Sequence, residues 1–312
     1  MVFLCETRNQ LQKMKRLRGR LGLHGFEGIS SQGKSGGLAL FWDESMYVSI
    51  QDVNERWIDV FVRVAPSEPL WRVTFVYGEP RVENRHLMWE SLCRLRNTSE
   101  LPWLVAGDFN EALWECEHMS MMARPQAQMI AFWDCFEMCQ LVDLGFSSYP
   151  FTYNNKRSGR ANVQVRLDRA AADNAWRDMF PEATVLHLTS PQSGHRPLLL
   201  RCAQDTQVKM AKARRYEVMW ECEASLAEVV AAAWAASGVK IDLGGVSKAL
   251  KSTMLRLHEW SNKKIGNVTR EIEKSGTRLE ELHNMNADHS EIRKESDHMD
   301  ELLYKEEMMW LQ

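Results

Sequence analysis

An acidic side chain and an amide side chain lie two positions apart where an apolar segment ends. The segment Leu104 to Ala106 runs into Gly107, and Asp108 and Asn110 follow. Because residues i and i+2 of a strand share a face, both side chains can point out of the end of a sheet at one substrate. Such a pair could bind a phosphate, a metal ion or an attacking water. The alternative is a strand followed by an Asx turn, since Asp and Asn are common turn residues.

Similar polar positions recur beside other apolar segments along the chain. They are Glu6, Tyr77, Asn155, Asp168 and His195. Polar groups at the ends of many separate strands are typical of a site built on a sheet scaffold. Four of them also have a simpler interpretation: Glu6 as an exposed strand-terminal residue, Tyr77 as a core aromatic, Asn155 as a turn-forming residue and His195 as a structural histidine.

Six short motifs in a fixed order carry a resemblance to a known family. They are Phe3-Leu4-Cys5-Glu6-Thr7, Ser35-Gly36-Gly37-Leu38-Ala39-Leu40-Phe41-Trp42, Tyr77-Gly78-Glu79-Pro80, Gly107-Asp108-Phe109-Asn110-Glu111, Arg166-Leu167-Asp168-Arg169 and Ser193-Gly194-His195-Arg196-Pro197. In these motifs the chain resembles the endonuclease/exonuclease/phosphatase superfamily, and most closely the endonuclease domain of plant non-LTR (LINE-type) retrotransposons. The resemblance covers nearly all of residues 1 to 202. It implies metal-dependent nicking of DNA phosphodiester bonds.

Hydrolysis of a phosphodiester needs a cation near the non-bridging oxygens, a group that directs water and stabilisation of the leaving oxygen. Glu6, a hard oxygen ligand, is the expected ligand of Mg²⁺ or Mn²⁺. Asp108 would orient or deprotonate the attacking water. Asn110 and Tyr77 would donate hydrogen bonds to the phosphate.

The resemblance pairs His195 with Asp168. A carboxylate beside the imidazole fixes its tautomer and favours its cationic form, which stabilises a phosphate oxyanion. Asn155 is expected to contact the substrate through its amide. DNA is therefore the expected partner.

Two departures from the family pattern argue against full activity. Family members begin with an additional strand that carries an Asn of the metal site, whereas this sequence starts at Met1-Val2-Phe3-Leu4. The family's His normally follows an Asp, and here that position is Gly194. We therefore expect an N-terminally truncated domain with weak metal binding and low or absent turnover. The alternatives are a non-catalytic remnant with a helical protein-interaction segment, and a phosphatase of the same superfamily.

Hydrophobic periodicity predicts the elements that position these residues. Strands are predicted at 2–4, 38–42, 47–50, 58–64 and 71–77, and helices at 9–21, 84–95 and 126–139. Strands, hairpins and helices mixed in this way favour a two-sheet α+β sandwich over a doubly wound parallel sheet. The resemblance implies the same four-layer α/β/β/α arrangement.

After Cys202 the pattern changes to helix, so residues 1–202 and 203–312 are predicted to form separate parts. An apolar stripe at three- and four-residue spacing comprises Ile265, Val268, Ile272, Leu279, Leu282, Ile292, Met299, Leu302 and Leu303. It predicts a helical hairpin or coiled coil, with helix-helix association through 265–303. By resemblance this part is the connector that follows the endonuclease.

The net charge of -3 and the pI near 6.3 exclude a global basic field. Binding to DNA must then use a local patch. A basic stretch comprises Lys13, Lys15, Arg16, Arg18 and Arg20. A solvated helix face is an equal alternative for it.

The seven cysteines are odd in number and form no CxxC pair, which indicates reduced thiols rather than a disulfide framework. Cys135 and Cys139 have a spacing compatible with metal binding, but core packing is favoured because no second pair exists. No segment reaches transmembrane length and no signal peptide opens the chain. We expect a soluble protein of the nucleus or cytoplasm.

Overall fold

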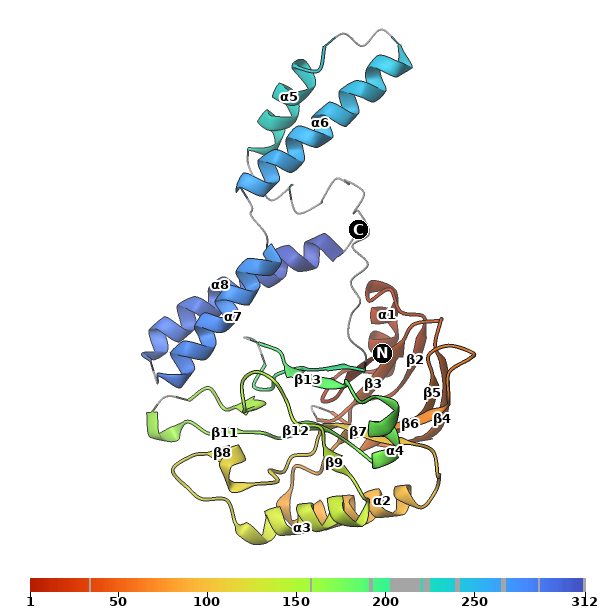
Figure 1. The fold of residues 1–312 in the computed structure, drawn as a ribbon. Helices are drawn as coiled ribbons and strands as arrows, with labels where there is room; N and C mark the ends of the chain where they lie inside the picture. The colour runs from red at the N-terminus through yellow and green to blue at the C-terminus, as the bar shows by residue number, and fades with distance from the viewer. Residues whose placement is uncertain are drawn as a thin grey trace. The chain divides into compact units, whose positions relative to one another are not determined.

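The computed structural model describes residues 1–33, 35–157, 159–190, 193–202, 220, 225–238, 242–264, 268–285 and 287–310. The chain divides into two compact units, Met1–Asp205 and Thr206–Gln312 (Figure 1). The described residues of the first unit form four sheets and several helices, and those of the second form helices.

The strands of the first unit are β1 (Val2–Leu4), β2 (Gly25–Ile29), β3 (Leu38–Trp42), β4 (Tyr47–Val53), β5 (Trp57–Arg63), β6 (Trp71–Tyr77), β7 (Trp103–Asp108), β8 (His118–Met119), β9 (Val142–Asp143), β10 (Tyr153–Asn154), β11 (Gln164–Val165), β12 (Asp168–Ala172), β13 (Thr184–His187) and β14 (Leu198–Arg201). Its helices are α1 (Leu11–Arg20), α2 (Arg85–Arg96), α3 (Gln126–Met138) and α4 (Asn174–Met179), with short 3-10 turns at Val82–Asn84, Glu115–Glu117 and Gly159–Ala161.

The central sheet has six strands in the order β4-β5-β6-β7-β12-β9. Its pairs are antiparallel except for β6 with β7, which run parallel. Ile58, Val60 and Val62 are fully buried, as the alternation predicts, whereas Val64 lies beyond the end of β5 and is exposed. Smaller sheets have the orders β1-β3-β2, β10-β11-β8 and β13-β14.

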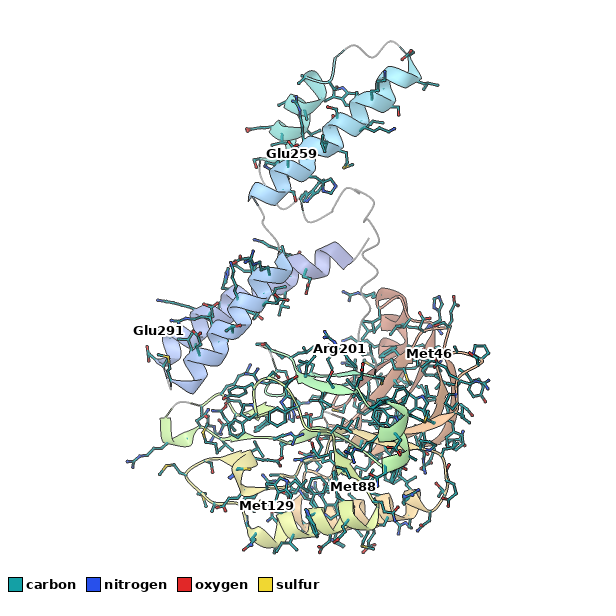
Figure 2. The ribbon with its side chains drawn as sticks, in the orientation of Figure 1. Met46, Met88, Met129, Arg201, Glu259 and Glu291 are labelled. Atoms are coloured by element: carbon teal, nitrogen blue, oxygen red, sulfur yellow. The ribbon has the colours of Figure 1, made fainter. Side chains whose placement is uncertain are left out.

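The elements of the first unit stack in four layers. Helices α2 and α3 pack on one face of the central sheet, and Met88 and Met129 are buried in this layer (Figure 2). The other face shares a core with β3, whose Leu38 and Leu40 are fully buried, and with β13 and β14. Helix α1 covers the outer side of β3 through Met14. This order of helix, sheet, sheet and helix confirms the predicted α+β sandwich.

Helices account for most of the described second unit. They are α5 (Leu226–Ala235), α6 (Leu243–Lys264), α7 (Val268–Asn284) and α8 (His289–Trp310). Helices α7 and α8 pack against each other. The predicted stripe places Leu279, Leu282, Met299 and Leu302 among the buried residues, while Ile265 lies outside the described residues. The coiled-coil geometry and association with a partner stay predictions.

Among the helices that the structure describes, none is both long and apolar enough to span a membrane.

Candidate active site

Three polar side chains form a row across the adjacent strands β6, β7 and β12. Tyr77 pairs with Asp108 in the parallel β6-β7 register, and Asp108 pairs with Asp168 in the antiparallel β7-β12 register. The row lies at the end of β6 and of β7 and at the start of β12. The order of the strands therefore brings together positions that are far apart in the sequence.

Two left-handed backbone positions shape the end of β7. Gly107 has a φ of +142°, and a Cβ atom there would lie 2.1 Å from the carbonyl oxygen of Val76, so only glycine lets β6 and β7 approach. Asn110 has a φ of 56°, a conformation that Asn tolerates better than most residues. Its backbone N–H donates to Asp108 Oδ1 at 2.8 Å, which holds the Asp108 carboxylate in place.

Glu6 lies two residues after β1 and reaches the row from the β1-β3-β2 sheet. It has a φ of 49°, a strained conformation for this residue type. The Tyr77 hydroxyl donates to Glu6 Oε1 at 2.5 Å, and Arg8 Nη2 lies 3.3 Å from Glu6 Oε2. The Glu6 side chain keeps 40% of its surface exposed, so it remains accessible to a solvated ion or ligand.

His195 lies on the other side of the row, in the loop before β14. Its Nδ1 is 2.9 Å from Asp168 Oδ2. Asp168 is itself fixed because Thr152 Oγ1 accepts the backbone N–H groups of both Leu167 and Asp168, each at 2.9 Å. The ring of Tyr153 packs against the imidazole with centroids 4.9 Å apart. The pairing implied by the resemblance is present in the structure.

Charge crowding changes the ionisation of these groups. Burial and then the negative charge of Asp168 raise the pKa of Asp108 to about 8, against an opposing effect of His195. Burial alone would lower the pKa of His195, but the hydrogen bond and charge of Asp168, with help from Asp108, raise it to about 9. Burial and the bond to Glu6 raise the pKa of Tyr77, which remains a neutral donor. At pH 7 His195 is therefore cationic.

The cluster suits a divalent cation. Asp108, Asp168 and His195 each offer one ligand atom, and these three atoms lie within 4.8 Å of one another. The negative charge of Glu6 also acts on Asp108 and raises its pKa. The like charges of these carboxylates repel in a largely buried place, so a bound cation would relieve the repulsion. Carboxylate oxygens are hard ligands that suit Mg²⁺ or Mn²⁺.

The two amides differ in their placement. Asn110 adjoins the row, but its Nδ2 donates to Gly78 O at 3.0 Å and to Asp108 Oδ2 at 3.2 Å, so a bond to phosphate would have to replace one of these. Asn155 instead organises its own loop, because Nδ2 donates to Ala161 O at 2.9 Å and Oδ1 accepts the Val163 N–H at 3.1 Å. These bonds support turn formation, and a substrate contact by Asn155 stays a prediction.

Three neighbours of the site were not predicted as site residues from the sequence. Thr152 fixes Asp168, and Tyr153 packs on the imidazole of His195. The thiol of Cys5 is held among the carboxylates, since burial and then the charges of Asp108 and Asp168 raise its pKa. Their positions beside Asn155 and Glu6 in the sequence were the available signals.

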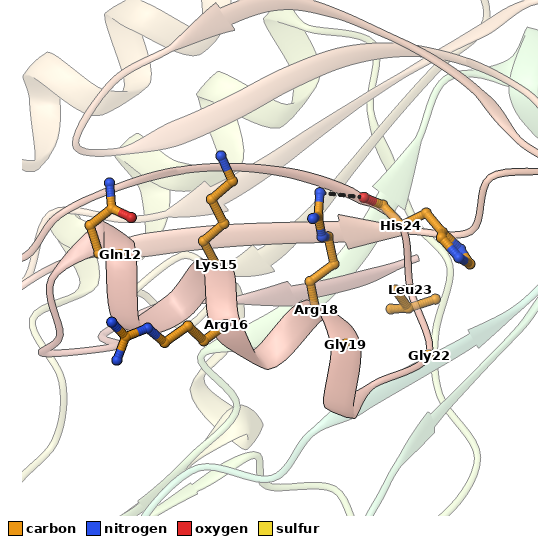
Figure 3. A pocket seen from close by; sticks show the side chains of 8 residues that line it. All are labelled: Gln12, Lys15, Arg16, Arg18, Gly19, Gly22, Leu23 and His24. Atoms are coloured by element: carbon orange, nitrogen blue, oxygen red, sulfur yellow. Dashed lines mark hydrogen bonds between the residues drawn. The ribbon is translucent and has the colours of Figure 1, made fainter.

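A basic hollow lies beside α1. Figure 3 shows Lys15, Arg16 and Arg18 projecting from the helix, with Arg18 Nη1 bonded to the carbonyl oxygen of His24 at 2.9 Å. The lining residues are Gln12, Lys15, Arg16, Arg18, Gly19, Gly22, Leu23 and His24. Lys15 and Arg16 are exposed because the helix packs on the sheet through Met14 and Leu17 instead.

A family model described as the endonuclease/exonuclease/phosphatase family matches residues 1–190. The fold resembles an AP endonuclease from Archaeoglobus fulgidus, with a TM-score of 0.50 and 18% identity over 64% of this chain and 88% of that one. It also resembles a 3'-5' exonuclease from Neisseria meningitidis, with a TM-score of 0.48 and 16% identity over 64% of this chain and 87% of that one. A third similar structure is the endonuclease domain of TRAS1, a telomere-specific non-LTR retrotransposon. Its TM-score is 0.45 and its identity is 15%, over 68% of this chain and 100% of that one. No curated protein matches the sequence.

Proposed function

The chain belongs to the endonuclease/exonuclease/phosphatase family, and we propose that it is a LINE-type endonuclease that nicks DNA by metal-dependent hydrolysis of a phosphodiester bond, at a reduced rate. The observation that carries this proposal is the convergence of Glu6, Tyr77, Asp108, Asp168 and His195 at one place. A carboxylate cluster beside a cationic imidazole can activate water and stabilise a phosphate oxyanion. The six motifs in order favour the LINE type.

Five residues of the site have a role in this proposal. Glu6 would hold the divalent ion together with the neighbouring carboxylates, and the ion would neutralise the phosphate oxygens and favour the ionised form of Asp108. Asp108 orients the water and accepts its proton. His195 presents its positive charge to the phosphate, and Asp168 and Thr152 are positioning residues that fix the imidazole.

The basic hollow beside α1 is a suitable place for the DNA backbone outside the reacting phosphodiester. Lys15 and Arg16 are exposed cations in a chain whose net charge is -3. Contacts between such side chains and phosphates position DNA without reading its sequence. Binding should therefore weaken steeply with added salt.

Conversion of supercoiled plasmid to nicked circles tests the proposal. We expect slow nicking with Mg²⁺ or Mn²⁺ and none with a chelator in excess of the metal. The His195→Ala variant, purified identically, controls for contaminating nuclease. Release of phosphate from small phosphomonoesters without nicking would instead identify a phosphatase. Failure of both reactions would support a non-catalytic remnant whose helices bind another protein.

Gly194 is one of the two reasons for expecting a reduced rate. Glycine supplies no oxygen beside His195, and a Cβ atom there would lie 3.2 Å from Asn154 O and 3.3 Å from Tyr153 Cε2, a fit that needs only a small adjustment. The second reason concerns the Asn-bearing strand of the family. Among the described residues β1 pairs with β3 alone, so its other edge could accept an added strand. A strand joined ahead of Met1 could pair with its other edge and bring an Asn to Glu6.

We expect Gly194→Asp alone to raise nicking less than an extended variant with such an Asn-bearing strand. The variant that combines both changes should exceed the product of the two single effects, because both changes act on one metal site. Plasmid nicking by the four members of this cycle measures the coupling, with the same strand carrying Ala in place of Asn as control. Equal rates in the parent and the combined variant would show that neither change addresses what limits this chain.

A further inference from the structure

A cluster of three cysteines lies between α2 and α3. Cys93 comes from α2, Cys135 from α3, and Cys139 directly follows α3. Their sulfur atoms all lie within 4.8 Å of one another, and the Cys139 and Cys93 sulfurs are 3.8 Å apart. The sequence pattern singled out only two of these thiols, and the packing of the two helices supplies the third.

We propose that Cys93, Cys135 and Cys139 form a three-thiolate site for a soft d¹⁰ cation, of which Cu(I) is the physiological type and Cd²⁺ a convenient probe. Thiolate ligands select soft ions of this kind, and the cluster offers sulfur alone. The site is chemically distinct from the carboxylate cluster, which offers hard oxygen donors and an imidazole. The proposal does not depend on the proposed nuclease chemistry.

The sulfur spacing is close to what one bound ion requires. With metal-sulfur bonds of about 2.3 Å, three thiolates around one ion lie roughly 3.8 to 4.0 Å apart. The Cys139-Cys93 separation already has this value, and the third sulfur needs a shift of at most about 1 Å from its 4.8 Å limit. Cys135 and Cys139 are one helical turn apart, so both can face Cys93.

Burial distinguishes this cluster from adventitious surface thiols. Cys135 and Cys139 are 2% and 0% exposed, whereas Cys93 is half-buried and is the most exposed of the three. Cys135 Sγ is 3.6 Å from Trp89 O, a weak bond that a metal-sulfur bond can replace. Three donors suit an ion of low coordination number, since structural zinc sites usually take four protein ligands. A bound ion would connect the two helices that cover the central sheet.

Titration of the reduced full-length protein with Cd²⁺ tests the proposal. The readout is the ultraviolet sulfur-to-cadmium charge-transfer band, which carboxylates do not produce. We expect this band to saturate at one tightly bound equivalent, and an unfolding temperature that rises with Cd²⁺ because the ion binds only the folded chain. Cys93→Ser should weaken binding at least about 100-fold, whereas the matched control Cys116→Ser, at an exposed cysteine, should leave it unchanged.

X-ray absorption on the unmodified protein gives a result that does not depend on any variant folding. Three sulfur neighbours per cadmium would support the site. Two or fewer sulfurs, no charge-transfer band, or a band that persists in a folded Cys93→Ser variant would overturn it, and the cysteines would then be ordinary core residues.

Discussion

Replacing His195 by alanine is expected to lower the rate of metal-dependent DNA nicking by about 10²- to 10⁴-fold, the usual range for a group that assists proton transfer or charge stabilisation. The imidazole is cationic at neutral pH because Asp168 and Asp108 hold its pKa near 9. Alanine removes that charge and leaves Asp168 without its partner at 2.9 Å. Rates are measured on supercoiled plasmid with protein in excess, so that slow turnover is still visible.

His86→Ala is the matched control for this prediction. His86 is exposed on α2, in the helix layer, and has no assigned role in the reaction. Its replacement should leave the nicking rate unchanged, and both variants should unfold at temperatures close to that of the parent. Equal nicking by the parent and a folded His195→Ala protein would contradict the proposed mechanism.

Replacing Arg169 by methionine is expected to reduce the free energy of unfolding by about 3 to 5 kcal/mol, the typical cost of leaving buried charges without a partner. Arg169 is fully buried. Its Nη2 donates to Glu117 Oε2 at 2.8 Å and its Nη1 donates to Asp143 Oδ2 at 2.9 Å. Methionine keeps much of the volume but leaves both carboxylates short of a donor, although Arg166 still contacts each of them.

The same network predicts a change in pH dependence. Burial alone would raise the pKa values of Glu117 and Asp143, but the charges of Arg169 and Arg166 lower both below their ordinary 4.5 and 3.8. A carboxylate with a depressed pKa in the folded state stabilises the fold above its unfolded-state pKa, and this stabilisation is lost as the pH falls through the folded-state pKa. The parent should lose stability below about pH 4.5, and Arg169→Met should lose less there.

Urea unfolding at pH 7 and at pH 4, followed by tryptophan fluorescence, measures both effects. The control is Arg94→Met, at an exposed arginine of α2, for which a change within about 0.5 kcal/mol is expected. A loss no larger than that of the control at pH 7 would mean that the buried network contributes little to the first unit.

The sequence by itself determined several of the main strands and helices and which residue types could act. Apolar alternation located β5 and β6, helical spacing located α2 and α3, and the polar residue after each apolar segment gave Glu6, Asp108 and Asp168. These are local properties of the chain, because side-chain periodicity follows directly from backbone geometry. Strand β2 was missed because its glycines look like breaks. Instead, Gly25 and Gly28 allow close approach of the Trp42 side chain and the Leu38 backbone.

Only the tertiary structure decided which of these residues meet. Strand order and register placed Tyr77, Asp108 and Asp168 in one row, and the packing of two sheets brought Glu6 and His195 to it. The raised pKa of Asp108 follows from that meeting, since burial and neighbouring charge are not properties of the local sequence. The tertiary structure likewise decided that the Asn155 side chain forms hydrogen bonds within its own loop. It also placed Cys93 beside two cysteines that are more than forty residues away in the sequence. Contacts between distant segments depend on how the layers pack, which periodicity does not encode.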